Sequence, residues 1–249
     1  MTRVVFYRVL LITAAVLLLE ALCLAGVIDR LTMPPPHRIL RDLALILISG
    51  SQNAAILKTL SNASVALAFA LIVGIASAVA LHGYRAVRET LEPLFATYYA
   101  VPIFAFYPLL IVIMGLGDAP QIAIGFMLGV VAVIVNTLNG LDRVPRVLRK
   151  SARIQRLNPV ETTLTVTLPY AAPYVLTGAK LALAYSLIGV IGAEFIMSRG
   201  GMGYEISFAY TNFDNATMYP LILLILLVSI TLNTALSRWE KALLARRGQ

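Results

Sequence analysis

Long apolar runs separated by short polar segments dominate this sequence. Six of them approach the roughly 20 residues that a membrane-spanning helix needs: about 6–28, 60–82, 91–114, 119–139, 172–197 and 217–236. Pro102 and Pro108 interrupt the third run, which predicts a kinked or split helix there. The pattern therefore predicts an all-α membrane protein with about six transmembrane helices, forming one domain over residues 1–249.

Two shorter segments have patterns of their own. After Pro34-Pro35-Pro36, apolar residues recur at helical spacing (Ile39, Leu40, Leu43, Leu47), and Gly50 follows. This predicts an amphipathic helix on the membrane surface that ends at Gly50. The stretch 199–216 is rich in glycine and aromatic residues and predicts an external loop.

The polar break at 139–170 carries six Lys/Arg against two acidic residues. Arg143, Arg146, Arg149, Arg153 and Arg156 fall three or four apart, which predicts one stripe along a helix. Asn158-Pro159 predicts a turn, followed by a second short element from Val160 to Thr167 that Leu168-Pro169 ends. Such a stripe could bind anionic lipid headgroups or dock into an acidic groove. Two short helices at an angle favour docking.

Composition supports a membrane protein. The chain has 249 residues, of which 59% are hydrophobic and only 13% charged, too few charges for a water-facing surface of this size. Its net charge of +8 fits membrane topology better than nucleic-acid binding, because the basic residues flank apolar runs. With both termini cytoplasmic, most Lys and Arg fall inside, as the positive-inside rule requires. The break at 139–170 is then cytoplasmic too.

Motifs for catalysis are missing from the sequence. It contains no G-x-x-x-x-G-K-[ST] for nucleotide phosphates and no H-E-x-x-H, and His37 and His82 lie in different polar segments. We therefore expect no enzyme activity, no metal site and no cofactor bound by this chain. A secondary transporter or channel that uses Glu20 or Glu194 as a coupling-ion site remains an alternative, and a membrane enzyme is a third.

The cytoplasmic break resembles the loop pattern E-A-A-x3-G-x9-I-x-L-P of ABC importer permeases. Leu168-Pro169 sets the register, which places Val166 at the Ile, Arg156 at the Gly and Lys150-Ser151-Ala152 at E-A-A. The flanking TLPYAAPYVLTGAKLALAYSLIGVIGAEFI and GGMGYEI, together with MPPPHRIL…ISG and VPIFAFYPLLIVIMGLG, resemble the nitrate/sulfonate/taurine group of these permeases. The resemblance covers about residues 33–237.

This resemblance implies a type I ABC importer permease fold with a cytoplasmic coupling segment at 143–169. It implies these residues as contacts to a separate ATPase: Arg149, Lys150, Ser151, Ala152, Arg153, Arg156, Leu157, Asn158, Pro159, Leu168 and Pro169. Two ATPase copies would hold ATP and Mg²⁺, a second permease copy would complete a homodimer, and an external solute-binding protein would deliver substrate. The implied location is a bacterial inner membrane. The implied solute is a small organic or inorganic anion such as a sulfonate, nitrate or an aromatic acid, with a neutral pyrimidine-type vitamin precursor as the alternative.

Two departures from the family pattern lead to specific expectations. Arg156 stands where the family has Gly, and a Cβ disfavours positive φ, so we expect Asn158 and Pro159 to carry the bend instead. Lys150 reverses the charge of the family's Glu, so the partner ATPase should offer a more acidic groove.

Candidate residues for the translocation pathway are polar or aromatic and lie in the predicted spans. They are Tyr98, Tyr99, Asn136, Asn139 and Glu194. Each has a second interpretation: the tyrosines could pack, the asparagines could bond across helices, and Glu194 could make a structural or gating hydrogen bond. Glu20 is expected to pair with a neighbour or lie near the outer interface. Lys180 is expected to snorkel inward or brace another helix.

Overall fold

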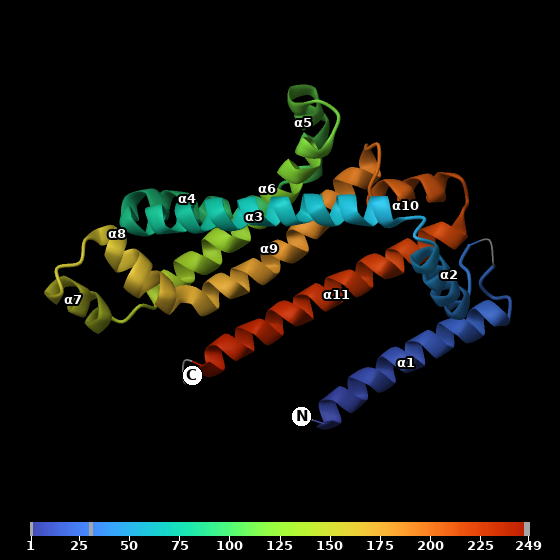
Figure 1. Ribbon diagram of the computed structural model, residues 1–249, viewed down its shortest axis with the longest axis horizontal. Coiled ribbons are helices and arrows are strands. Elements are labelled where there is room, and N and C mark those ends of the chain that lie inside the picture. Colours follow the sequence, from blue (N-terminus) through green and yellow to red (C-terminus); the bar gives the residue numbers. More distant parts are fainter. Residues whose placement is uncertain (1, 30–31, 247–249) are drawn as a thin grey trace.

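A computed structural model describes residues 2–29 and 32–246, and this part of the chain is helical throughout (Figure 1). The order of elements is α1 (Thr2–Leu24), α2 (Pro36–Ser49), α3 (Asn53–Gly83), α4 (Arg85–Thr97), η1 (Tyr98–Ala100), η2 (Ile103–Phe106), α5 (Tyr107–Met114), α6 (Asp118–Asp142), α7 (Arg146–Ile154), α8 (Pro159–Thr162), η3 (Thr163–Thr167), α9 (Leu168–Ile196), α10 (Met202–Thr211) and α11 (Asn215–Arg246).

Five of these helical stretches are long and apolar enough to cross a membrane. They are Phe6–Leu24, Asn53–Gly83, Asp118–Asp142, Pro159–Ile196 and Asn215–Lys241. A sixth candidate is the pair Ala86–Ala100 and Ile103–Met114, which is bent by 88°. The prediction of about six spans is confirmed, with the third one broken.

The break in the third span lies at Pro102 alone. Tyr98–Ala100 forms one 3₁₀ turn before it, and Ile103–Phe106 forms another after it. Pro108 instead lies in the first turn of α5, where a missing N–H breaks no helical hydrogen bond. The expected distortion is therefore found at Pro102 and not at Pro108.

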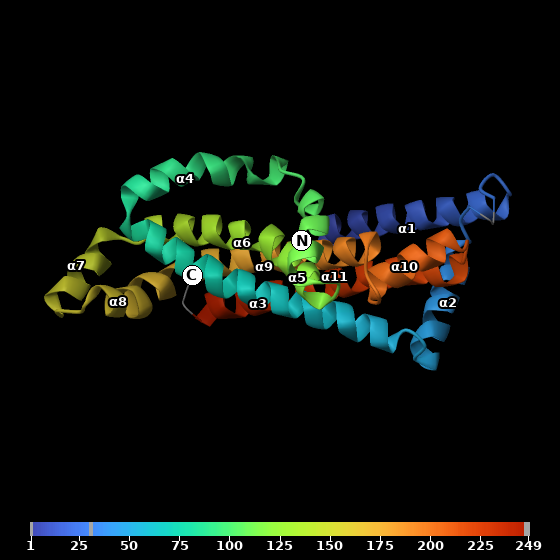
Figure 2. The same cartoon turned by 90° about the horizontal axis from the view of Figure 1, so that it is seen from above.

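The centre of the bundle is α6 and α9 packed together, with α3 against both (Figure 2). Small residues allow this close approach: a Cβ built on Gly189 of α9 would lie 2.7 Å from the Cα of Gly125 of α6. From α3, Ala66 and Ala70 are fully buried against the same pair. In lipid, such small-residue contacts drive helix association, because apolar burial alone offers little.

A second cluster joins α2, α10 and α11. Its buried residues are Leu43, Met202, Ile206, Leu221 and Leu224. The helix α2 begins at Pro36 and ends at Gly50, whose φ of 68° is the left-handed conformation typical of a helix end. The expectation of a loop over 199–216 is wrong for its middle part. Met202–Thr211 is a helix, because Met202 and Ile206 bury one apolar face in this cluster.

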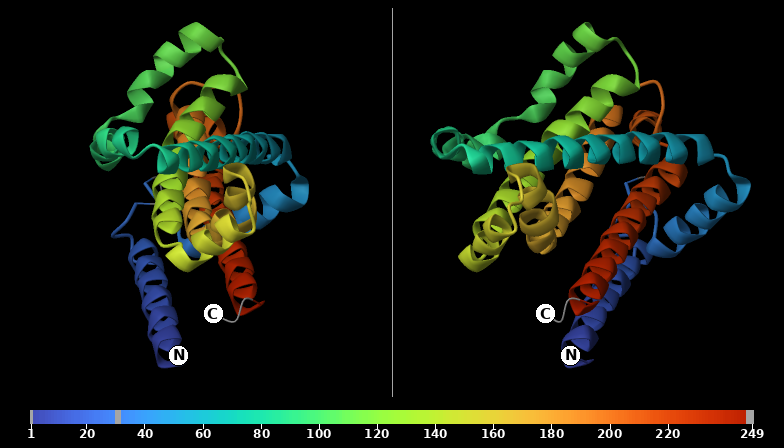
Figure 3. Two further views of the ribbon diagram at one scale, coloured as in Figure 1. Left: turned by 90° about the vertical axis from the view of Figure 1, so that its left-hand side faces the viewer. Right: turned by 60° about the vertical axis from the view of Figure 1, so that its left-hand side comes forward.

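Short helices lie at both ends of the bundle. α7 and α8 lie at one end, and α2 and α10 lie at the other (Figures 1 and 2). The helix α9 runs away from the end that carries α8, and α11 runs back toward it. Figure 3 shows α4 and α5 projecting from one flank of the core and α1 standing apart beside α11.

Two polar side-chain contacts tie peripheral helices to their neighbours. Glu20 of α1 contacts His37 of α2, with 2.5 Å between Oε1 and Nδ1. Lys180 of α9 forms an ion pair with Glu240 of α11. Glu20 therefore pairs with a neighbour and Lys180 braces another helix, each as one of its two interpretations anticipated.

Candidate functional site

The helix α7 ends in a left-handed turn at Arg156. The N–H of Leu157 donates to Ala152 O (3.1 Å) and that of Arg156 donates to Arg153 O (3.0 Å). This is the Schellman pattern of a helix C-terminus, and its left-handed residue is Arg156, with φ of 55°. The expectation that Arg156 would resist positive φ, and that Asn158 would carry the bend, is wrong. The two terminal hydrogen bonds impose the conformation despite the Cβ.

Asn158 and Pro159 start the next helix. Asn158 Oδ1 accepts from the N–H of Glu161 (2.8 Å), and Glu161 Oε2 accepts from the N–H of Asn158 (2.9 Å). This reciprocal pair is a capping box, with Pro159 at the first helical position. Asn158 has φ of −70°, so it is an N-cap residue and not the left-handed one.

Leu168-Pro169 does not end the second element, contrary to expectation. The helix continues from α8 through the π-helical turn η3 into α9. Pro169 lacks an N–H, and its ring excludes the carbonyl four residues earlier. The helix widens there, and the N–H of Leu168 donates to Thr163 O. The Leu-Pro pair therefore lies inside the continuous helical stretch Pro159–Ile196, directly after its π-helical turn.

The basic residues of the segment do not form one stripe. Ala152 is buried and Arg149 is turned inward, whereas Arg146, Lys150 and Arg153 are exposed. Arg143 lies just beyond α6 and stacks over Tyr174, with 5.2 Å from Cζ to the ring centroid. The outer face of α7 instead carries two large apolar side chains, Val147 (74% exposed) and Ile154 (83% exposed).

Sequence reasoning missed this apolar pair because it followed the arginines. The available signal was the spacing of Val147 and Ile154, seven residues apart and so on one helical face. Exposed apolar side chains on a polar, protruding helix mark an interaction site. The structure therefore places an exposed face that is both apolar and basic on α7.

A cavity of about 430 Å³ lies between α4, α6 and α9. Tyr99, Asn136 and Asn139 all line it, together with Arg88, Glu92, Phe95 and Tyr185. The rings of Tyr99 and Tyr185 are 5.2 Å apart. Asn136 uses one amide N–H on Ala132 O (2.8 Å).

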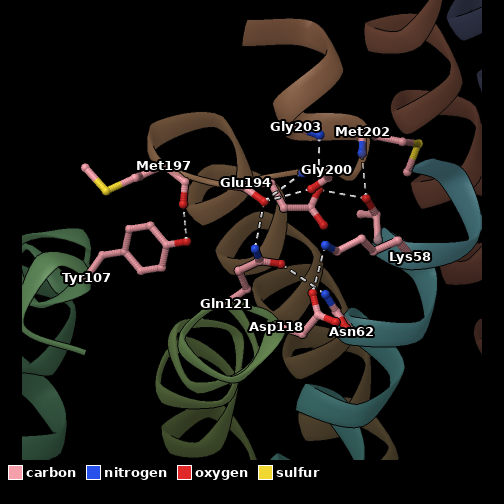
Figure 4. Close-up of polar contacts among 12 residues, drawn as sticks. Lys58, Asn62, Tyr107, Asp118, Gln121, Glu194, Met197, Gly200, Met202 and Gly203 are labelled. Carbon is pink, nitrogen blue, oxygen red and sulfur yellow. Dashed lines mark hydrogen bonds and ion pairs between the residues drawn. The ribbon is translucent and has the colours of Figure 1, made fainter. Parts of the chain in front are cut away.

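The other two candidate pathway residues, Tyr98 and Glu194, do not line this cavity. Tyr98 donates its hydroxyl to Met127 O (2.9 Å). Glu194 is completely buried in a polar cluster at the C-terminal end of α9 (Figure 4). The structure thus brings three of the five together. It adds Arg88 and Tyr185, which sequence reasoning did not single out.

The Glu194 cluster joins α3 and α9 to the start of α10. Glu194 Oε2 accepts from Thr59 Oγ1 (2.7 Å) and from the N–H of Gly203 (3.1 Å). Thr59 Oγ1 in turn accepts from the N–H of Met202 (2.7 Å). Gly201 has to be glycine here: its φ is 105°, and a Cβ would lie 2.3 Å from the Glu194 carboxylate.

A chain of amide hydrogen bonds continues beside this carboxylate (Figure 4). Asn62 donates to Gln121 Oε1 (3.0 Å), and Gln121 Nε2 donates to Ser198 Oγ (2.8 Å). Lys58 and Asp118 form an ion pair at its edge, 3.0 Å apart. The cluster accepts hydrogen bonds from the first two backbone donors of α10, those of Met202 and Gly203. In the described residues no group of three or more His, Cys, Asp or Glu could hold a metal ion.

The fold and these sites define a multi-span membrane protein with a protruding helical segment at one end and a cavity between helices. The sequence profile of the family described as binding-protein-dependent transport system inner membrane component matches residues 37–249. This chain belongs to that family.

Relatives and solved structures agree with this. The chain is 28% identical to a nitrate import permease protein of Leptolyngbya laminosa, over 70% of this chain and 63% of that protein. It is 27% identical to a taurine transport system permease protein of Escherichia coli, over 73% and 68%. The fold is similar to a chain of the MetNI methionine ABC transporter in inward-facing conformations: TM-score 0.64, 19% identity, 76% of this chain and 94% of that one.

Membership fixes the general role. The protein is the permease subunit of a binding-protein-dependent ABC importer and spans the inner membrane several times. A solute-binding protein delivers the solute, and a partner subunit hydrolyses ATP. The nucleotide chemistry, with ATP and Mg²⁺, belongs to that partner.

Proposed function

We propose that this permease imports a small organic or inorganic anion, with a sulfonate, nitrate or an aromatic acid as the candidates. The similarity to nitrate and taurine permeases supports this class, because nitrate is an anion and taurine carries a sulfonate. The path runs through the cavity between α4, α6 and α9. Amide and hydroxyl groups there can hydrogen-bond an anion, and in the described residues the lining's one guanidinium, Arg88, already pairs with Asp142. Weak sites of this kind let a solute both enter and leave.

The coupling segment 143–169 docks on the ATPase. The observation that carries this proposal is the outer face of α7, where Val147 and Ile154 are exposed among Lys150 and Arg153. A hydrophobic centre with a basic rim fits a groove with an apolar floor and acidic edges. The remaining residues shape the segment: Ala152 packs inward, Arg156 and Leu157 close α7, and Asn158 and Pro159 open α8.

Two identical permease copies and two ATPase copies form the complete transporter. Both termini and α7 face the cytoplasm, and α2 and α10 face outward, where the solute-binding protein delivers its cargo. The distribution of Lys and Arg supports this orientation. Closure of the ATPases on ATP moves the docked segments and switches the cavity between inward and outward access.

Co-purification tests the docking face. The double variant Val147→Ser, Ile154→Ser is expected to lose the ATPase subunits from the purified complex while the permease remains folded. Full burial of a Val or Ile side chain in an interface contributes about 1.5–3 kcal/mol. The matched control is Ile48→Ser, because Ile48 on α2 is equally exposed (85%) at the opposite end. Retention of the ATPase by the double variant would contradict the proposed docking face.

Uptake into proteoliposomes tests the substrate class. The complex with its ATPase and binding protein is expected to accumulate a labelled sulfonate, nitrate or aromatic acid only when ATP is present. Unlabelled anions of the same class should compete for uptake, whereas neutral analogues should not. Accumulation driven by an ion gradient without the ATPase would instead support the secondary-transporter alternative.

A further inference from the structure

We propose that Arg149 is a positioning residue that transmits the movement of α7 to the mouth of the cavity, through His82 and Asp142 to Arg88. This inference rests on the proposed coupling function. It assigns to Arg149 an inward role, separate from the outer face of α7 that docks on the ATPase.

Arg149 joins α7 to the ends of two membrane helices. Its Nη2 donates to Leu141 O of α6 (2.8 Å) and lies 3.0 Å from His82 Nε2 of α3. Leu141 is in the last turn of α6, where carbonyl groups have no helical partner and the helix dipole favours a cation. Arg149 therefore holds α7 against α6 and α3 together.

The imidazole of His82 lies between Arg149 and Asp142. A guanidinium has only donors, so Nε2 of His82 accepts and the ring proton lies on Nδ1. Nδ1 faces Asp142 Oδ1 at 3.4 Å. Nδ1 makes no hydrogen bond within the described residues, so the ring links Arg149 to Asp142 through this close polar contact alone.

Asp142 connects the row to its last member, Arg88, through a bidentate ion pair. Arg88 Nη1 donates to Asp142 Oδ1 (2.7 Å), and Nη2 donates to Oδ2 (2.6 Å). Two parallel charge-assisted hydrogen bonds fix both distance and direction. Arg88 lies near the start of α4, so the row spans α7, α3, α6 and α4 in turn.

Arg88 is where this row meets the proposed pathway. Together with Glu92, it lines the cavity of about 430 Å³ that contains Tyr99 and Asn136. The same two side chains line a second, polar cavity of about 470 Å³ that contains His82, Asp142 and Arg149. A movement of α7 that displaces Arg149 would therefore act on Arg88, which lines both cavities.

Directional polar contacts suit this role. An apolar interface can slide by small steps, whereas the bidentate Arg88–Asp142 pair is either formed or broken, and so it can switch between two arrangements. Arg149, His82 and Arg88 are each only partly exposed, whereas Asp142 is exposed. Water therefore screens the contact between Arg149 and His82 less than it screens the outer cations of α7.

The test compares transport with ATP hydrolysis in the complete complex, reconstituted with its ATPase and binding protein. Arg149→Ala is expected to retain the ATPase subunits and hydrolysis within about twofold, while solute taken up per ATP falls about tenfold. Arg238→Ala is the control, because Arg238 is exposed on α11, outside the coupling segment. It is expected to leave the ratio unchanged.

A second set of variants keeps the test decisive. His82→Asn and Asp142→Asn should each lower the same ratio, and combining either with Arg149→Ala should add little, because one row is already broken. These variants also serve if Arg149→Ala does not fold.

Three results would overturn the inference: an unchanged ratio in Arg149→Ala, loss of the ATPase subunits from it, or fully additive effects. If the wild-type complex itself shows no ATP-driven uptake, the proposed function fails and not this assignment alone.

Discussion

Arg156 shows how one residue can keep a family geometry without the family's side chain. It adopts φ of 55° at the C-terminus of α7, at the glycine position of the loop pattern that this sequence resembles. The two Schellman hydrogen bonds hold it there, at a local cost of about 1 kcal/mol for a residue with a Cβ. The bend of the coupling segment thus survives, with conformational strain stored at its apex.

We expect Arg156→Gly to stabilise the protein by about 1 kcal/mol, because glycine removes the Cβ penalty of the left-handed turn. Thermal unfolding of the detergent-solubilised protein measures the change. Arg153→Gly, three residues earlier and inside α7, should do the opposite and destabilise by about 1 kcal/mol, since glycine weakens a helix interior. Equal effects of the two variants would rule out strain at Arg156.

Glu194 is a structural hydrogen-bond acceptor as well as a candidate pathway residue. We expect Glu194→Ala to lower stability by about 3 kcal/mol, because it leaves the buried donors of Thr59 and Gly203 unpaired. Glu194→Gln keeps one acceptor oxygen and should cost about 1 kcal/mol or less. Chemical or thermal unfolding of both variants gives the comparison, and a larger loss for Gln than for Ala would contradict this role.

At the scale of elements, the contact between α6 and α9 depends on the absence of side chains. Gly189→Ala is expected to destabilise by about 2 kcal/mol, because its Cβ would lie 2.7 Å from the Cα of Gly125 and the helices would have to separate. Gly83→Ala in α3 is the matched control, since a Cβ there meets nothing within 4 Å. Its expected effect is neutral to slightly stabilising, and melting temperatures separate the two.

The helix α10 illustrates an element that local sequence hides. Its glycines and aromatic residues resemble those of a loop, yet Met202 and Ile206 are buried against Leu43 of α2 and Leu221 of α11. The carboxylate of Glu194 and the hydroxyl of Thr59 accept hydrogen bonds from its first backbone donors. Its partners come from three distant parts of the chain, so no local pattern could predict it.

At the scale of the whole molecule, the proposed orientation predicts labelling of engineered cysteines. Ser151→Cys on α7 should react with a membrane-impermeant maleimide only from the cytoplasmic side. Ser51→Cys, between α2 and α3, should react only from outside. Both serines are exposed, and the native Cys23 is buried, so a Cys23→Ala background gives little interference. Inside-out and right-side-out vesicles distinguish the sides, and labelling of both positions from one side would reject the topology.

The sequence by itself determined the class of fold, the approximate spans and the position of the polar break between them. Apolar runs of membrane length, the positions of Lys and Arg, and the spacing from Ala152 to Leu168-Pro169 are all local signals. They are legible because the bilayer imposes a uniform solvent and a fixed length on every span.

Only the tertiary structure decided what individual side chains do. It turned Arg149 inward while leaving Val147 and Ile154 outside, gathered Tyr99, Asn136 and Asn139 around one cavity, and placed Glu194 elsewhere. It also put positive φ on Arg156, against its intrinsic preference. The physical reason is that helical periodicity gives the relative directions of side chains around an axis. Which direction faces a neighbour is set by packing between helices that lie far apart in sequence.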